Sequence, residues 1–142
     1  NSHHQELNDA VGHELEAYAQ ATLVDCHSFP SEPLPCDLNQ TRPRPDFCIG
    51  TDPFHTPKEL ADALIMKIQE WGYSVIENEP YEGTLVPSDY YRSNASAQSI
   101  MIEVNRALYM DEHTGQKLES FPIIQAHIKG LLSFIQQYRD RR

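Results

Sequence analysis

Residues 46–77 read DFCIGTDPFHTPKELADALIMKIQEWGYSVIE, in which two short apolar segments flank a longer amphipathic one. The segments 46–50 and 73–77 have the length and the apolar character of buried strands. Between them, Thr56 precedes a proline at the start of a helix-like segment, and apolar residues then recur at helical spacing up to Gly72. The stretch therefore predicts a strand, a helix and a strand, the unit from which parallel sheets are built.

The flanking sequence continues this alternation in both directions. Upstream, apolar spacing predicts a helix over 2–20, followed by a short buried strand over 21–25 that ends in a polar loop. Downstream, a strand is predicted over 99–104 and a helix over 121–138. Helices and strands thus alternate along the whole chain, as they do in α/β proteins.

Two long segments between these elements have no regular pattern. Residues 30–45 contain five prolines, which exclude a helix or a central strand, and residues 78–94 form the second irregular segment. We expect both segments to run over the surface. The whole pattern predicts a single α/β domain over 1–142, a three-layer sandwich with a mainly parallel mixed sheet.

Polar residues follow each predicted strand. In open α/β sheets, ligands bind beyond the carboxyl ends of the strands. We therefore expect four polar clusters to converge on one rim of the sheet, namely 25–28, 50–52, 77–79 and 103–106.

The composition is that of an ordinary globular chain and argues against nucleic acid as a partner. The chain has 142 residues, of which 39% are hydrophobic and 23% charged, enough apolar surface for one core. Its formal net charge of −10 repels phosphate backbones and anionic membrane surfaces. No apolar run approaches the length of a membrane span, and the three cysteines lack Cys-x-x-Cys spacing. We expect a soluble, cytoplasmic protein with free thiols.

His27 is the first candidate for a functional site. It directly follows the predicted strand over 21–25, so rigid backbone would hold its imidazole at the rim of the sheet. Imidazole nitrogen suits zinc, and Asp25 or Ser28 can supply the contact that fixes the tautomer. The alternative is an ordinary loop histidine. Cys26 points away from His27 if the strand continues, so we expect Cys26 to be a buried thiol rather than a nucleophile.

Glu103 is the second candidate. It lies within the apolar strand predicted over 99–104, and a carboxylate that is partly removed from water has a raised pKa, as a general base requires. The alternative is a structural ion pair with Arg106. Arg106 in turn can bind a substrate carboxylate through two parallel hydrogen bonds, or form an internal ion pair.

Four segments, in the same order, resemble the N-formylglutamate amidohydrolase family. They are DCHSFPS at 25–31, PDFCIG at 45–50, NEPYEG at 78–83 and IEVNRALYMDE at 102–112. The resemblance implies the phosphorylase/hydrolase-like α/β fold of the zinc carboxypeptidases. It also implies an enzyme of histidine breakdown that cleaves N-formyl-L-glutamate, a small acyl-amino acid, to formate and L-glutamate.

The resemblance also implies roles for individual residues. His27 is similar to a zinc-ligand histidine of the family, with Zn²⁺ as the cofactor, and Glu103 is similar to its catalytic carboxylate. Zinc would polarise the formyl carbonyl and activate a water molecule, and Glu103 would take the proton of that water. Arg106, Tyr81 and Arg92 are expected near the carboxylates of the substrate.

The sequence also departs from the family pattern. The family's chain is about twice as long, and its other zinc ligands, a His and an acidic residue, lie in an N-terminal half. Glu82-Gly83 stands where the family has a double glycine. We expect the C-terminal part of a larger amidohydrolase domain, incomplete at the N-terminus, whose open sheet edge promotes self-association. The alternatives are a related zinc carboxypeptidase or amidase for another acyl-amino acid, and a non-catalytic binding domain without a complete metal site.

Overall fold

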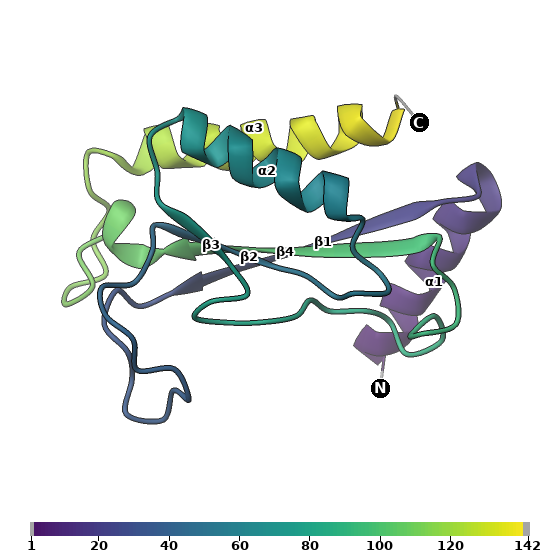
Figure 1. The fold of residues 1–142 in the computed structure, drawn as a ribbon, viewed down its shortest axis with the longest axis horizontal. Coiled ribbons are helices and arrows are strands. Elements are labelled where there is room, and N and C mark those ends of the chain that lie inside the picture. Colours follow the sequence, from purple (N-terminus) through teal and green to yellow (C-terminus); the bar gives the residue numbers. More distant parts are fainter. Residues whose placement is uncertain (1, 141–142) are drawn as a thin grey trace.

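Residues 2–140 of the computed structural model form three helices and four strands (Figure 1). In chain order the elements are α1 (Ser2–Tyr18), β1 (Ala21–Phe29), β2 (Phe47–Gly50), α2 (Lys58–Glu70), β3 (Val75–Glu77), β4 (Ala97–Asn105), a short 3-10 helix (Arg106–Leu108) and α3 (Phe121–Asp140). Every predicted helix and strand is present. The largest correction is to β1, which pairs with β4 along its whole length, so His27 and Ser28 lie within the strand rather than in a loop.

The strands form one mixed sheet in the order β1-β4-β2-β3. β1 is parallel to β4 and β2 is parallel to β3, but β2 is antiparallel to β4. The α/β class is confirmed, whereas the expectation that four polar clusters converge on one rim is wrong. The carboxyl ends of β1 and β4 lie at one end of the sheet, and those of β2 and β3 lie at the other. Clusters 25–28 and 103–106 therefore meet, while 50–52 and 77–79 meet at the opposite end.

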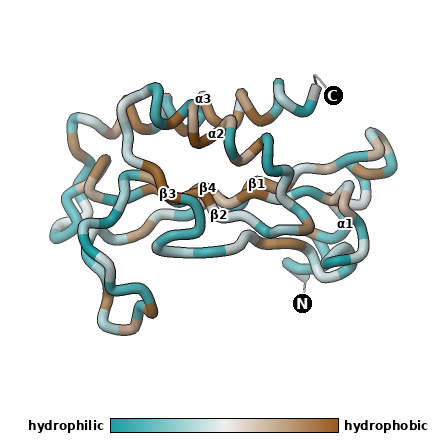
Figure 2. Tube along the Cα trace, viewed as in Figure 1, coloured by the Kyte–Doolittle hydropathy of each residue, from teal (hydrophilic) through white to brown (hydrophobic). Residues whose placement is uncertain are grey.

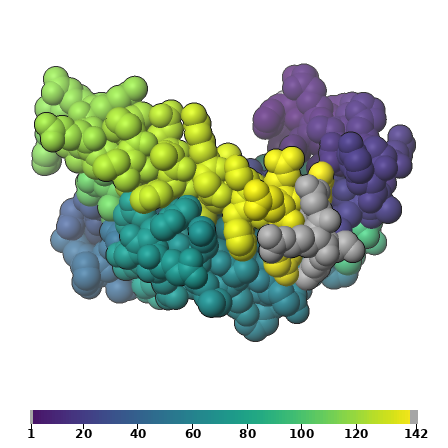
Figure 3. All heavy atoms as spheres, turned by 90° about the horizontal axis from the view of Figure 1, so that it is seen from above, coloured from purple at the N-terminus to yellow at the C-terminus, as the bar shows by residue number. Residues whose placement is uncertain are grey.

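Helices α2 and α3 cover one face of the sheet, which we call the helix face. Both helices lie along this face, and Figure 3 looks onto them from above. Their apolar sides and the inward residues of the strands form the main core, whose fully buried members include Phe47, Ile49, Ile100, Leu64, Ile68 and Leu131. In Figure 2 the strands are brown, because hydrophobic residues concentrate in this layer. Removal of this apolar surface from water stabilises the fold.

The opposite face, which we call the loop face, has a different covering. The irregular segments 30–46 and 78–96 run over it, and α1 packs beside the amino ends of β1 and β4, where Val11 meets Ala21 and Ala97. The third layer of the sandwich is therefore mostly irregular backbone with one helix at its end.

Strand β1 is an edge of the sheet, with β4 as its neighbour among the described strands. Its edge position also corrects the expectation for Cys26, which is exposed rather than buried, because α3 leaves this part of β1 uncovered. An apolar groove of about 480 Å³ opens here between β1 and α3. Self-association through this edge remains a prediction, which sizing with light scattering would test. None of the helices in residues 2–140 is long and apolar enough to cross a membrane.

Candidate functional site

His27 and Glu103 lie side by side at the carboxyl ends of the two parallel strands. They are Cα partners in the register of β1 with β4. Strand residues alternate between faces, and Ile102 and Val104 point into the helix-face core, so Glu103 and His27 point to the loop face. Two residues predicted separately from the sequence are thus brought together by strand pairing.

Asp25 precedes His27 by two residues on the same face of β1 and contacts it directly. The distance from His27 Nε2 to Asp25 Oδ1 is 2.7 Å. The other oxygen, Oδ2, accepts a hydrogen bond of 3.2 Å from the backbone N–H of Leu85. Because the Asp25 carboxylate accepts a hydrogen bond from the Nε2–H group, the lone pair of the neutral imidazole is on Nδ1. The His27 side chain is 52% exposed.

Glu103 is buried, with 7% of the residue exposed. Its Oε2 atom has no hydrogen-bond partner among residues 2–140. Burial raises the pKa of Glu103 above its ordinary value, and the charge of Asp25 adds to this, while His27 and Arg106 oppose it. A carboxylate with a raised pKa and an unpartnered oxygen is better suited to accepting a proton than an ordinary exposed carboxylate.

The other side of Glu103 is formed by β2 and the segment that follows β3. Cys48 is the antiparallel Cα partner of Glu103 and is fully buried. Its thiol donates to the backbone carbonyl of Tyr81, with an Sγ–O distance of 3.2 Å. Next to it, Gly50 allows the chain to pass very close, since a Cβ atom there would lie 2.1 Å from the carbonyl oxygen of Gly83. The segment 81–83 is therefore pressed onto the loop face beside Glu103.

Arg106 lies three residues beyond Glu103, at the end of β4. Its guanidinium donates from Nε to the Ser28 hydroxyl and from an Nη atom to the Ser28 carbonyl, both at 3.2 Å. The alternative of a direct ion pair between Arg106 and Glu103 is therefore not what the structure shows. Arg106 is held at the carboxyl end of β1, close to the site.

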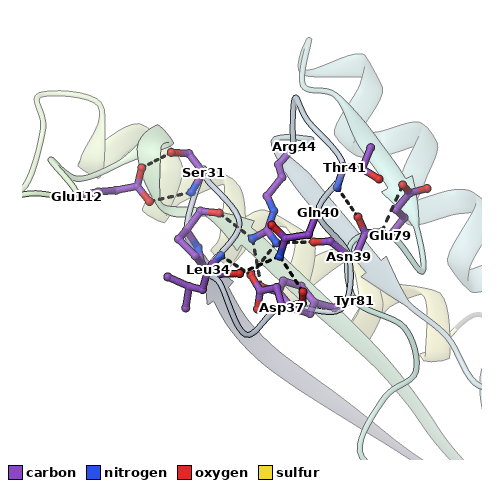
Figure 4. Close-up of polar contacts among 11 residues, drawn as sticks. Ser31, Leu34, Asp37, Asn39, Gln40, Thr41, Arg44, Glu79, Tyr81 and Glu112 are labelled. Atoms are coloured by element: carbon purple, nitrogen blue, oxygen red, sulfur yellow. Dashed lines mark hydrogen bonds and ion pairs between the residues drawn. The ribbon is translucent and has the colours of Figure 1, made fainter.

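Tyr81 has its hydroxyl engaged by two side chains from segment 30–46. It accepts from an Nη atom of Arg44 at 3.2 Å and donates to Asp37 Oδ2 at 3.4 Å (Figure 4). A polar cavity of about 700 Å³ lies between residues 36–41 and 78–82, with Tyr81 in its wall.

Arg92 lies at the other end of the sheet. Its backbone N–H donates to Nε2 of the buried His55, and Nδ1 of that ring is 2.8 Å from the carbonyl of Ala97, the first residue of β4. Glu103 is six residues further along this strand, which at the rise of a β-strand is about 20 Å away. The structure thus groups His27, Glu103, Arg106 and Tyr81 and does not place the backbone of Arg92 with them.

The side chains of the site do not form a complete zinc centre by themselves. A catalytic zinc has three protein ligands, and residues 2–140 contain no group of three His, Cys, Asp or Glu side chains that could hold a metal. His27 with its Asp25 contact has the form of one ligand and the carboxylate that orients it. Zinc binding through His27 therefore needs donors beyond this set.

Arg44 is a residue of this region that sequence reasoning missed. It is buried and contacts Asp37 and Tyr81, yet it comes from the proline-rich segment 30–45, which has no periodicity to show which side chains point inward. Its one signal in the sequence is its place between two prolines, three residues before a buried strand begins at Phe47.

Comparison with known proteins gives a consistent result. The family model of N-formylglutamate amidohydrolase matches residues 1–110. The crystal structure of N-formylglutamate amidohydrolase from Ralstonia eutropha JMP134 is similar with a TM-score of 0.81 and 27% identity, over 97% of this chain and 50% of that one. A gene product of Agrobacterium tumefaciens, at 22% identity and a TM-score of 0.57 over 94% of this chain and 50% of that one, shares the fold. This chain spans about half the length of both, and no curated protein matches it.

Proposed function

The chain belongs to the N-formylglutamate amidohydrolase family, and from this premise we propose that it takes part in the hydrolysis of N-formyl-L-glutamate to formate and L-glutamate. The observation that supports this most directly is Glu103, a buried carboxylate with a raised pKa beside His27. Glu103 is proposed as the catalytic base, and His27 as the residue that binds the metal.

The reaction needs one proton to be taken up and then returned. A water oxygen adds to the formyl carbon while its proton passes to Glu103, and the C–N bond then breaks as Glu103 returns the proton to the leaving nitrogen. The unpartnered Oε2 atom of Glu103 is the proposed acceptor. The burial of Glu103 raises its affinity for the proton.

The substrate carries two carboxylates, so the site needs positive charge. Arg106 is proposed to bind one carboxylate, because the residue is only half-buried and its guanidinium lies at the carboxyl end of β1. Tyr81 is proposed as part of the wall on the other side of Glu103. Arg92 is also proposed for the substrate, but its backbone position requires the substrate or the segment 86–96 to reach along the sheet.

Zinc is part of the proposal but not of the steps described above. When bound, zinc would lower the pKa of a coordinated water. Only His27 is proposed as its ligand in this chain, through Nδ1, since Nε2 faces Asp25. We therefore expect His27→Ala to abolish any zinc affinity of this chain, measured by calorimetry.

The test of the proposed function is formate release from N-formyl-L-glutamate, with and without added zinc. We expect Glu103→Gln to lower kcat by at least about 100-fold, the usual size of a general-base effect. Glu16→Gln, an exposed carboxylate on α1, is the matched control and should leave the rate unchanged. Turnover that survives Glu103→Gln would exclude Glu103 as the base. Faster turnover of N-acetyl-L-glutamate would favour an amidase for another acyl-amino acid.

A second candidate is a non-catalytic domain that binds the acyl-amino acid. The shortage of metal ligands favours this second candidate, because residues 2–140 contain no group of three side chains that could hold a metal. Calorimetry with N-formyl-L-glutamate distinguishes the two. Binding without turnover, zinc present, would support the second candidate, whereas turnover would exclude it.

We also propose that the protein acts in the cytoplasm, in histidine breakdown. Its three cysteines are free thiols, and two of them, Cys26 and Cys36, are exposed, which fits a reducing compartment. The assignment to histidine breakdown depends on N-formyl-L-glutamate being the substrate, so the activity test also tests this assignment.

A further inference from the structure

Arg44 places a charged group in an unusual position, fully inside the loop face. Its side chain is 1% exposed. Burial of a cation is costly unless it is paired and hydrogen-bonded. The guanidinium is paired with Asp37, with an Nη to Oδ2 distance of 2.8 Å. The pKa of Asp37 is lowered by the backbone N–H of Leu34 and then by Arg44, so the carboxylate stays ionised.

The remaining contacts of Arg44 join separate parts of the chain. It donates to the carbonyls of Pro30 at 3.1 Å and Asn39 at 3.3 Å, and to the hydroxyl of Tyr81 at 3.2 Å. The guanidinium carbon also lies 6.0 Å from the ring centre of Phe29 and 5.4 Å from that of Tyr81. Figure 4 shows Asp37, Asn39 and Tyr81 around the side chain of Arg44.

These contacts connect the two sides of the candidate site. Phe29 follows His27 by two residues on the same face of β1. Its ring packs edge-on against the ring of Tyr81, with 5.9 Å between the ring centres. Tyr81 is anchored at its carbonyl by Cys48, the Cα partner of Glu103. We propose that Arg44 is a positioning residue that holds the Tyr81 segment, residues 78–83, against the end of β1 and so shapes the substrate side of the site. This inference rests on the proposed function of that site.

Arg44 acts through Tyr81 rather than on the substrate. Both of its terminal nitrogens donate to protein groups and its charge is balanced by Asp37, while its Nε atom has no hydrogen-bond partner among residues 2–140. Arg106 differs, because it is only half-buried and has no carboxylate within ion-pair distance among the described residues. Loss of Arg44 therefore changes where Tyr81 lies, and it leaves Glu103 and His27 in place on their strands.

The test compares Arg44→Met and Arg44→Lys with Arg42→Met. Arg42 is the matched control, because it lies two residues away and forms a surface ion pair with Glu32. With N-formyl-L-glutamate we expect Arg44→Met to raise KM by about 10-fold with kcat within about 3-fold, the pattern of lost substrate binding. Arg44→Lys keeps the charge and should give an intermediate KM. A fall in kcat with unchanged KM would overturn the proposal.

A double-mutant cycle shows whether Arg44 acts through Tyr81. Tyr81→Phe removes the hydroxyl that accepts from Arg44. We expect the double variant to bind substrate no more than about 2-fold worse than Arg44→Met, because contacting residues are not additive. Full additivity would show that the two residues act separately.

Hydrogen exchange keeps the inference testable if the chain proves inactive. Arg44→Met should speed exchange at the amides of Leu34 and Gly83 by about 10-fold or more, through local opening, while α2 amides stay unchanged. Unchanged exchange at Leu34 and Gly83 would overturn the positioning role. Absence of both turnover and binding in the unmodified chain would instead overturn the proposed function, with the exchange result still valid.

Discussion

Strand β4 presents two different surfaces to the two faces of the sheet. On the helix face, Ile100, Ile102 and Val104 pack against apolar side chains of α2 and α3. On the loop face, Ser99 donates to the carbonyl of Leu85 at 2.6 Å, and Asn105 donates to that of Pro45 at 3.1 Å. The same strand therefore binds helices by burying apolar area and binds irregular segments by hydrogen bonds.

The difference explains where the candidate site lies. An irregular segment has backbone groups that its own secondary structure leaves unpaired, so a face covered by such segments needs polar side chains. Glu103, Cys48 and Arg44 belong to that polar layer. The helix face supplies stability, whereas the loop face holds groups whose burial is costly and which are useful for chemistry.

The helix face should be the more sensitive of the two to truncation. Leu64 on α2 is fully buried in the main core. We expect Leu64→Ala to lower the free energy of unfolding by about 2–5 kcal/mol, because it leaves a cavity. Urea unfolding followed by circular dichroism measures the change. If Leu64→Ala lowered the free energy of unfolding less than Gly50→Ala on the loop face does, the view that the helix face supplies most of the stability would be wrong.

Added volume should disturb the loop face most at Gly50. A Cβ atom there would meet the Gly83 carbonyl at 2.1 Å and the Met101 side chain at 2.5 Å. We expect Gly50→Ala to destabilise by about 1–3 kcal/mol, the usual cost of overpacking, with faster amide exchange in 78–85. Gly115→Ala, at an open turn, is a control for volume alone, although its positive φ adds some strain. Unchanged amide exchange in 78–85 would show that this segment can move away from residue 50 without losing its hydrogen bonds.

Removal of the charge of Glu103 should stabilise the protein. Its pKa is raised in the folded state by burial, so folding is most favourable below the unfolded pKa and loses stability as pH rises through the folded one. Glu103→Gln has no such loss, and we expect it to gain about 0.5–2 kcal/mol at pH 7, as at other functional sites. Thermal unfolding from pH 4 to pH 8 should show the two stability curves separating as pH rises. Parallel curves would mean that Glu103 titrates normally.

The contact between α3 and α1 at the edge of the sheet should matter least. An Nη atom of Arg139 lies 3.3 Å from Glu14 Oε2 across this edge, and the guanidinium carbon of Arg139 is 5.3 Å from the ring centre of Tyr18. We expect Arg139→Met to cost about 0.5–1 kcal/mol, because partly exposed pairs are weak. Thermal unfolding in low and high salt measures it. A cost near that of Leu64→Ala would show that α1 is part of the main core.

The candidate site was predictable to the extent that it lies on regular structure. His27 and Glu103 were identified because each stands at or within an apolar strand. Arg44 was missed because its segment has no period, and its burial depends on Asp37 and Tyr81, which come from different parts of the chain. The backbone N–H of Arg92 donates to His55, which places the backbone of this residue near the amino end of β4, and its role toward the substrate stays a prediction.

The sequence by itself determined the helices, the strands and the apolar positions that form the helix face, since these follow from local periodicity and from prolines and glycines. Tertiary structure alone decided that β4 runs parallel to β1 and antiparallel to β2, because pairing of distant strands depends on the whole core and not on local pattern. That pairing puts His27 beside Glu103 and sends the polar ends of β2 and β3 to the opposite rim. It also brings Arg44, which lies between two prolines and 37 residues from Tyr81 in the sequence, into contact with Tyr81 on the loop face.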